Sequence, residues 1–287
     1  MKEISIKTPA KINFGLNIVS KRDDGFHNLE TIFYPINLFD EIIIKEDDHF
    51  SFNTANKQLK GEDNNSLMKA NEIFSEYTGI EITTSVTLKK HIPIGAGLGG
   101  GSSDGAAALR GFNHFYSAGL SNDELSILAL RIGSDAPYFI EPKPKFASLR
   151  GEVFESITLE IKKPILIVNP GIHISTKWAF SKIIPQVPFY SLRIIDQLAY
   201  NNFNELNALI TNDFEKVVFP EYPEIRKLKE RIYRLGAEFS LMTGSGSTVF
   251  GIFPDQASAL SAASGFPAEY LTLISSGLPE SVIVQKG

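Results

Sequence analysis

The stretch Gly95–Gly105 holds six glycines in eleven positions, and an alanine-rich segment follows it directly. Glycine loses more conformational freedom on folding than any other residue, so an ordinary turn uses only one or two. A cluster this dense indicates that the backbone adopts conformations closed to other residues, or that another molecule approaches the main chain closely. Any fold of this chain has to place the stretch where one of these demands exists.

Two common glycine motifs fit the stretch poorly. Gly95, Gly97 and Gly100 satisfy the dinucleotide pattern G-x-G-x-x-G. In the dinucleotide fold the glycines directly follow a buried parallel strand, whereas an alternating, half-polar strand and residues 91–94 precede them here. The P-loop requires a lysine after its last glycine, and Gly101 occupies that position. The context therefore argues against both motifs.

The remaining interpretation is a glycine loop that leads into a helix capped by Ser102 or Ser103. The unpaired N–H groups of the first helical turn and the positive end of the helix dipole would then point at one spot. This arrangement is an anion site built without lysine, to which the serine hydroxyls could add hydrogen bonds or a magnesium ligand. The alternative is a mobile loop before a helix.

The bulk composition limits the partners of the chain. Its 287 residues are enough for two joined domains. The net charge of -5 shows no basic excess, so we expect no nucleic-acid or membrane partner and only a local phosphate site. The chain has no cysteine, and no stretch approaches the ~20 apolar residues that span a bilayer. We expect a cytoplasmic protein, either a monomer or a weak homodimer.

The spacing of apolar residues predicts a mixture of antiparallel strands and helices. Strands are expected over residues 4–19, 40–46, 80–92, 164–171, 237–253 and 280–286. Helices are expected over residues 65–79, 102–116, 121–133, 206–219 and 223–236. Proline and charged residues break the pattern over 141–152, so we expect domains at 1–155 and 156–287. The predicted fold class is α+β rather than a doubly wound parallel sheet.

Four other stretches carry candidate functional side chains, each with an ordinary structural alternative. Lys11 and Asn13 share one face of a strand, where a lysine is usually only a solvated edge. Phe26–His27 beside a glycine turn could pack and cap rather than bind. Asp135 follows a helix and could cap the next one, or accept a proton from a substrate hydroxyl. Gly244–Ser247 is either a plain hairpin turn or a turn that closes over a ligand.

Six stretches, in order along most of the chain, resemble the GHMP kinase superfamily. They are PAKINFGLNI, DGFHNLET, PIGAGLGGGSSDGAAAL, GSDAPYF, VNPGIHIST and TGSGSTVFGIF. The resemblance implies ATP as the phosphoryl donor, a ribosomal-S5-like amino-terminal domain, a ferredoxin-like carboxy-terminal domain, and an active site in the cleft between them. The two amino-terminal stretches resemble a member that phosphorylates a hydroxyl of a cytidine-diphosphate substrate.

The resemblance also implies roles for residues that match its motifs. Lys11 and Asp135 take the catalytic places. The substrate would contact Asn13, Phe26, His27 and Phe180. ATP would contact Pro93, Ile94, Gly95, Ala96, Gly97, Leu98, Gly99, Gly100, Gly101, Ser102 and Ser103. Magnesium is expected to bridge the phosphates, but the sequence does not identify its ligands.

The chemistry of phosphoryl transfer agrees with these roles, because positioning and charge neutralisation dominate that reaction. Asp135 would accept the hydroxyl proton, and Lys11 would orient this carboxylate and offset charge on the transferred group. Two departures from the family stand out: Phe26 replaces a frequent Tyr, and Asp104–Gly105 replaces a more usual Asn or Asp followed by Ala. Another kinase of the superfamily acting on homoserine, mevalonate or a sugar, a non-catalytic ATP-binding module and an NAD-dependent dehydrogenase stay as alternatives.

Overall fold

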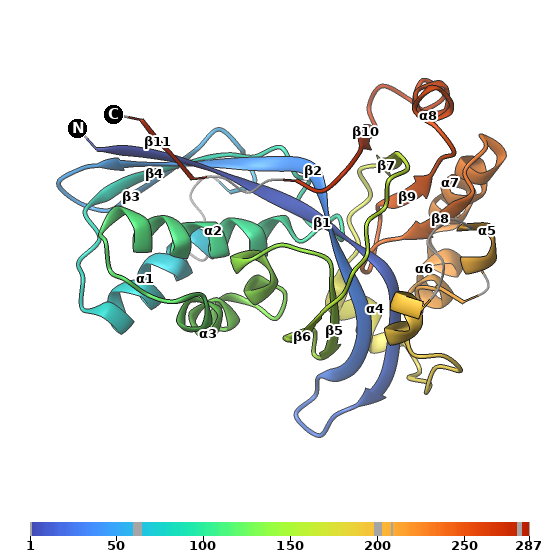
Figure 1. Cartoon of the computed structure of the whole chain (residues 1–287), viewed down its shortest axis with the longest axis horizontal. Helices are drawn as coiled ribbons and strands as arrows, with labels where there is room; N and C mark the ends of the chain where they lie inside the picture. The colour runs from blue at the N-terminus through green and yellow to red at the C-terminus, as the bar shows by residue number, and fades with distance from the viewer. Residues whose placement is uncertain (1, 60–64, 198–202, 208, 280–282, 287) are drawn as a thin grey trace.

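A long antiparallel hairpin connects the two halves of the molecule. The computed structural model describes residues 2–59, 65–197, 203–207, 209–279 and 283–286. Strands β1 (Glu3–Lys21) and β2 (His27–Glu46) pair along most of their length, and their register shifts at three places. Such irregularities bend a strand and increase its twist. The hairpin therefore starts within one sheet and curves past the second (Figure 1).

The first sheet contains seven strands in the order β11-β1-β2-β4-β3, with β5 paired to β2 and β6 paired to β5. The further strands are β3 (Ser51–Thr54), β4 (Thr84–Lys89), β5 (Lys145–Leu149), β6 (Val153–Ser156) and β11 (Ile283–Lys286). One face is covered by α1 (Ser66–Thr78), α2 (Gly100–Phe115) and α3 (Asn122–Ile132), followed by a 3-10 helix (Ala136–Ile140) (Figure 1). The alanines of α2 let it pack closely in this core.

The second sheet has four antiparallel strands in the order β10-β7-β9-β8. They are β7 (Ile165–Asn169), β8 (Phe239–Met242), β9 (Val249–Ile252) and β10 (Leu271–Ser275). Helical segments lie between β7 and β8 and between β9 and β10, which gives the ferredoxin-like order of strands. The helices are α4 (Thr176–Lys182), a 3-10 helix (Leu192–Gln197), α5 (Phe203–Leu206), α6 (Glu215–Glu221), α7 (Pro223–Arg234) and α8 (Gln256–Ala263).

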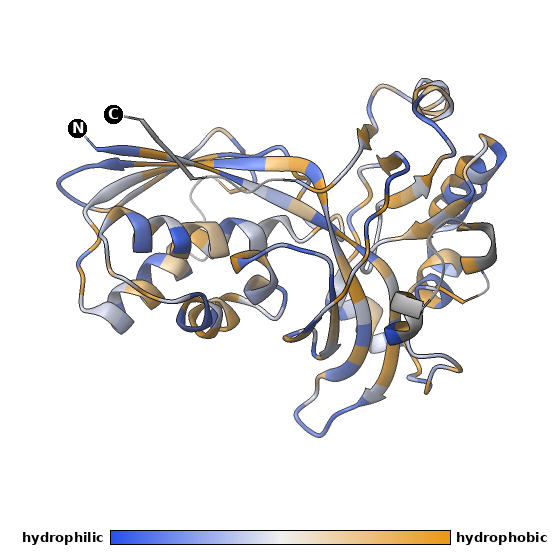
Figure 2. Ribbon diagram, viewed as in Figure 1, coloured by the Kyte–Doolittle hydropathy of each residue, from blue (hydrophilic) through white to orange (hydrophobic). Residues whose placement is uncertain are grey.

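The hydrophobic core joins the two sheets. One cluster of buried side chains combines Ile12 and Phe14 of β1 with Phe239 and Phe250 of the second sheet. The ring of Phe14 lies 5.1 Å from that of Phe239, measured between centroids. Figure 2 shows hydrophobic residues on β1 and β2 where the hairpin bends, and along the second sheet. The predicted α+β class with a ferredoxin-like second half is confirmed.

The sequence predicted helix ends well where short-range hydrogen bonds determine the end of the helix. Asn65 caps α1, which ends at Gly79 in a left-handed conformation. Ser121 and Glu124 form a capping box at the start of α3, and Gly133 follows its last residue. The strands β3, β5, β6 and β10 were not predicted, and β2 begins at His27 instead of at residue 40. Of the strand expected over residues 280–286, the part 280–282 lies outside the described residues.

Two predicted helix boundaries are wrong. Helix α2 begins at Gly100 after a Gly99 cap with φ of 72°, so neither Ser102 nor Ser103 caps it. The helix expected over 206–219 is interrupted between α5 and α6, because Asn212 pairs with Leu16 of β1 in a parallel bridge. The side-chain amide of Asn212 also donates to Met242 O at 2.7 Å. These tertiary contacts replace helical hydrogen bonds.

The division into domains at 155 and 156 stays a prediction. Strand β6 is the last element of the first sheet before β7 opens the second, and β11 returns to pair with β1. The carboxy-terminal strand thus belongs to the first sheet. Among the described residues, no helix is long and apolar enough to cross a membrane.

Candidate active site

Two cavities meet at the first turn of α2. The larger, of about 650 Å³, is lined by residues of β1, β2 and α4, and by Asp135. The smaller, of about 330 Å³, is lined without interruption by Pro93 through Ser102, together with residues at the start of α1. Ser102 lines both cavities. The glycine loop therefore forms a wall of one cavity at the place where the other begins.

The loop glycines meet different surroundings. Gly95, Gly97 and Gly99 have φ of 68°, 78° and 72°, a region that favours glycine. A Cβ on Gly97 would lie 2.3 Å from the carbonyl oxygen of Thr243, whereas a Cβ on Gly101 would meet no atom within 4 Å. Gly97 thus packs closely against the main chain of Thr243, whereas Gly101 borders open space in the smaller cavity.

The start of α2 presents unpaired donors, as expected for an anion site. The first helical hydrogen bond runs from the N–H of Ser103 to Gly99 O at 2.9 Å. The N–H groups that precede it in the first turn have no helical acceptor. The hydroxyl of Ser103 instead donates to Pro9 O at 2.7 Å and contacts the hydroxyl of Thr8. Ser103 thus fastens α2 to β1 and does not line either cavity.

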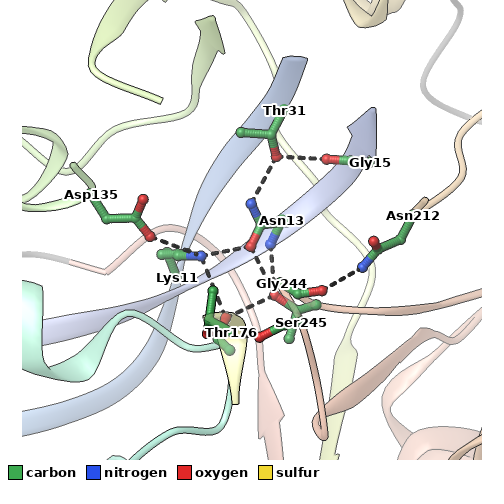
Figure 3. Close-up of polar contacts among 11 residues, drawn as sticks. Lys11, Asn13, Gly15, Thr31, Asp135, Thr176, Asn212, Gly244 and Ser245 are labelled. Atoms are coloured by element: carbon green, nitrogen blue, oxygen red, sulfur yellow. Dashed lines mark hydrogen bonds and ion pairs between the residues drawn. The ribbon is translucent and has the colours of Figure 1, made fainter. Parts of the chain in front are cut away.

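Lys11 and Asp135 face one another in the larger cavity (Figure 3). Lys11 Nζ lies 3.4 Å from Asp135 Oδ2, and the Lys11 residue is only 3% exposed. Burial lowers the pKa of Lys11 from its ordinary value, and the Asp135 carboxylate opposes that shift. The side chain of Asp135 is 36% exposed and makes no capping hydrogen bond. Its carboxylate is therefore available to a ligand in the cavity.

Asn13 connects the lysine to both glycine turns. Its Oδ1 accepts from Lys11 Nζ at 2.6 Å, and its Nδ2 donates to the hydroxyl of Thr31 at 2.8 Å. Its backbone N–H donates to the hydroxyl of Thr243 at 2.9 Å, and that hydroxyl lies 3.2 Å from Gly97 O. The network fixes the glycine loop, β1 and the turn after β8 relative to one another, which holds the Lys11 ammonium in place.

The turn after β8 forms part of the larger cavity. Gly244 and Ser245 line it, and the Ser245 hydroxyl lies 3.0 Å from that of Thr176 at the start of α4. Asn212 donates to Gly244 O at 2.8 Å (Figure 3). The contribution of Thr176 and Thr243 was not predicted, although the TGSGST stretch was singled out as a turn that could close over a ligand.

The predicted aromatic residues come together at the other end of the larger cavity. The rings of His27 and Phe180 are stacked, with centroids 5.0 Å apart and planes at 21°. Phe26 lines the same cavity and is 49% exposed. Burial, assisted by the charge of Lys21, lowers the pKa of His27. A neutral imidazole beside two phenylalanine rings is suited to a flat polar ring, because it offers both a donor and an acceptor.

A buried ion cluster borders the smaller cavity beside the start of α2, and two of its members, Lys90 and Asp104, line that cavity. Lys90 Nζ pairs with Asp40 and, at 2.7 Å, with Asp104 of α2. The other Asp40 oxygen accepts from the N–H groups of His91 at 2.6 Å and Ile92 at 2.9 Å. Burial raises the pKa of Asp104 to about 8, and the Lys90 ammonium opposes this shift. Sequence reasoning noted Asp104 only as a departure from the family and missed the cluster.

Comparison with known proteins assigns the chain to the GHMP kinases. The family model "GHMP kinases N terminal domain" matches residues 65–141, and "GHMP kinases C terminal" matches residues 194–271. The chain is 41% identical over 271 residues to the 4-diphosphocytidyl-2-C-methyl-D-erythritol kinase of Chlorobium phaeobacteroides, covering 93% of this chain and 94% of the relative. It is 40% identical to the Bacteroides thetaiotaomicron kinase of that name, over 85% of this chain and 90% of the relative.

A solved structure agrees with these relatives. The crystal structure of a 4-(cytidine 5'-diphospho)-2C-methyl-D-erythritol kinase superimposes with a TM-score of 0.81 and 27% identity, covering 96% of this chain and all of that one. The chain belongs to the 4-diphosphocytidyl-2-C-methyl-D-erythritol kinases of the GHMP kinase family.

Proposed function

We propose that the chain transfers the γ-phosphoryl group of ATP to the 2-hydroxyl of 4-diphosphocytidyl-2-C-methyl-D-erythritol, a step of non-mevalonate isoprenoid precursor synthesis. The names of the relatives at about 40% identity support this substrate. The observation that carries the proposal is the Lys11–Asp135 pair, whose atoms lie 3.4 Å apart in the larger cavity, with Lys11 Nζ also 3.4 Å from Gly97 O of the loop that lines the smaller cavity. A donor phosphate on the loop side and an acceptor on the aromatic side would meet there.

Asp135 is the base in this proposal. It accepts the proton of the acceptor hydroxyl while the oxygen attacks the γ-phosphorus, and the bond from that phosphorus to the bridging oxygen of ADP breaks. Lys11 holds the carboxylate in position, and its positive charge offsets the negative charge on the transferred phosphoryl group. The hydrogen bond from Lys11 to Asn13 holds the ammonium in place, so its position does not depend on the Asp135 carboxylate alone.

The smaller cavity is the proposed ATP site. Its loop donors and the start of α2 suit the β- and γ-phosphates, and Gly101 lets phosphate oxygens approach the backbone. Within the described residues no three His, Cys, Asp or Glu side chains gather into a metal cage. This fits Mg²⁺, which usually keeps several waters and binds through substrate phosphates. Mg²⁺ would supply neutralisation of phosphate charge, with the Ser102 hydroxyl as the protein ligand nearest the loop.

The aromatic end of the larger cavity is the proposed cytosine site. Phe26 and Phe180 offer ring faces for stacking, and His27 offers hydrogen bonds to the polar edge of the base. Phe26 keeps a stacking face where the family often has a tyrosine. The acceptor then extends from the aromatic rings toward Asp135.

The Asp135→Asn variant tests the base. We expect kcat to fall by about 10²–10⁴-fold, because a positioned acid or base contributes that much, while the Kd for ATP stays nearly unchanged. Asp123→Asn, on the exposed first turn of α3, is the matched control and keeps wild-type kcat. Full activity of Asp135→Asn would remove this residue from the mechanism.

The acceptor is tested separately by measuring ADP release with the cytidyl substrate, homoserine, mevalonate and sugars. Turnover with one of the other acceptors and none with the cytidyl substrate would overturn the specific proposal and favour another kinase of the superfamily. ATP binding without turnover of any acceptor would indicate a non-catalytic ATP-binding module.

A further inference from the structure

The larger cavity carries a surplus of positive charge. The ionisable side chains that line it among the described residues, apart from the histidine, are four cations and one carboxylate: Lys11, Lys21, Arg150, Lys177 and Asp135. This contrasts with the net charge of -5 for the whole chain. Lys11 pairs with Asp135, and Arg150 pairs at 3.1 Å with Glu152, which does not line the cavity, so a surplus of two positive charges remains. A cavity with such a surplus attracts an anionic ligand.

Arg150 differs from Lys21 and Lys177 because its guanidinium is held in place. Its Nε donates to Glu152 Oε1 at 3.1 Å, and its backbone N–H donates to Glu152 Oε2 at 2.6 Å. The guanidinium carbon lies 4.6 Å from the centre of the Phe26 ring. Lys21 and Lys177 are exposed and form no ion pair within the described part of the chain. Arg150 is thus a pre-organised fork, whereas the two lysines are flexible charges.

The place of Arg150 in the cavity is between its two functional ends. The guanidinium covers Phe26 at the proposed cytosine end. The next residue, Gly151, lies beside the proposed base, since a Cβ on it would be 3.7 Å from Asp135 Oδ1. The short turn between β5 and β6 therefore connects the cytosine site to the phosphoryl acceptor site.

We infer that Arg150 binds the diphosphate of the acceptor and makes the site specific for a nucleoside diphosphate. The inference rests on the proposed function, in which the cytosine ring and the reacting hydroxyl lie at opposite ends of the acceptor with the diphosphate between them. Arg150 donates to Glu152 through its Nε, and its two terminal NH2 groups have no hydrogen-bond acceptor among the described residues, so they can donate to a ligand in the cavity. A guanidinium matches phosphate oxygens with two parallel hydrogen bonds, and Glu152 and Phe26 hold the fork ready for them.

The test compares the inhibition constants of CDP and cytidine against the acceptor in wild type and in Arg150→Met. A charge-assisted hydrogen bond contributes about tenfold to hundredfold in affinity. In Arg150→Met the inhibition constant of CDP should therefore rise by that factor, while the inhibition constant of cytidine changes by less than about twofold. Arg150→Lys keeps the positive charge but lacks the planar guanidinium. We expect its affinity for CDP to lie between those of the wild type and Arg150→Met. The circular dichroism spectrum of each variant verifies that it folds.

Arg193→Met is the matched control. Arg193 also lies over a phenylalanine ring, at 5.0 Å from the centre of Phe146, and pairs with Glu155, but it does not line the cavity. This variant should bind both inhibitors as the wild type does.

Three results would overturn the inference. Equal weakening of CDP and cytidine in Arg150→Met would show that Arg150 only positions Phe26. Unchanged CDP binding would remove Arg150 from the site, and so would a loss of CDP affinity of the same size in Arg193→Met. Turnover of the complete acceptor by the wild type is measured in parallel. If that turnover is absent, the proposed function fails, whereas turnover with an unchanged CDP-to-cytidine ratio in Arg150→Met sinks only the role of Arg150.

Discussion

Replacing Gly97 by alanine should disrupt the glycine loop from its protein-facing side. The added Cβ would lie 2.3 Å from Thr243 O and 3.3 Å from Gly246 O, and both are main-chain atoms that cannot rotate away. Reaching ordinary contact therefore requires the loop and the turn after β8 to separate by roughly 1 Å. That shift weakens the 3.2 Å hydrogen bond from the Thr243 hydroxyl to Gly97 O.

The expected cost follows from these contacts. A side chain at the positive φ of 78° costs about 1–2 kcal/mol, and the lost hydrogen bond costs about 1 kcal/mol. Overpacking adds about 1–3 kcal/mol. Gly97→Ala should thus lower the free energy of unfolding by about 3 kcal/mol or more, measured by urea denaturation. The KM for ATP should rise at least about tenfold. A factor of ten requires that about 1.4 kcal/mol of this free energy be spent in restoring the loop conformation when ATP binds.

Gly101→Ala is the comparison that separates folding from binding. Its Cβ meets no protein atom within 4 Å and lies within helix α2, so the stability should stay equal or rise by up to about 1 kcal/mol. The methyl group faces the smaller cavity and should still raise the KM for ATP. Unchanged stability and ATP affinity in Gly97→Ala would refute the packing argument. Wild-type ATP affinity in Gly101→Ala would refute close approach of phosphate to the start of α2.

Three further predictions use other parts of the molecule. Burial raises the pKa of Asp104 from an ordinary 3.8 to about 8, so the folded state binds an extra proton between these values, and the stability from this group is lost progressively as pH rises from 3.8 to 8. Asp104→Asn removes this titration, so its advantage over wild type in free energy of unfolding should grow between pH 5 and pH 8 and level off above pH 8; equal pH profiles would contradict the assignment. Burial disfavours the charge of Lys11, so Lys11→Met should keep or raise the melting temperature while kcat falls by about a hundredfold. A clear loss of stability would show instead that the Asp135 pair outweighs burial. Ser121→Ala removes the capping box of α3 and should cost about 1 kcal/mol with unchanged kcat and KM; altered kinetics would mean that α3 communicates with the site.

Sequence alone was most informative where the decisive contacts lie within one turn of chain. Asn65 accepts from the N–H groups of Leu67 and Met68, and Ser121 accepts from that of Glu124. Both contacts span at most three residues, and the starts of the helices predicted over 65–79 and 121–133 agree with the structure to within one residue. The strand β4 was predicted from its alternation, because Thr84, Val86 and Leu88 face the core on one side of the sheet.

The interrupted helix between α5 and α6 shows why longer-range contacts escaped prediction. The apolar spacing over 206–219 suits a helix, but Asp213 accepts from the N–H of Ile18 at 2.7 Å and Asn212 donates to Gly244 O. Both partners are distant in sequence, and their hydrogen bonds outweigh local propensity. The same reason hides the cluster of Asp40, Lys90 and Asp104, since nothing near any one of these residues identifies the other two.

The glycine loop combines both cases. Its sequence indicates that the main chain is approached closely, but not from which side. Gly97 is approached by the carbonyl of Thr243, a residue 146 positions later, whereas Gly101 borders open space in the smaller cavity. Only the second of these glycines supports a bound anion. The density of glycine therefore reflects one demand from the fold and another from the proposed ATP site. The two demands are separable by substitution because they act on different residues of the loop.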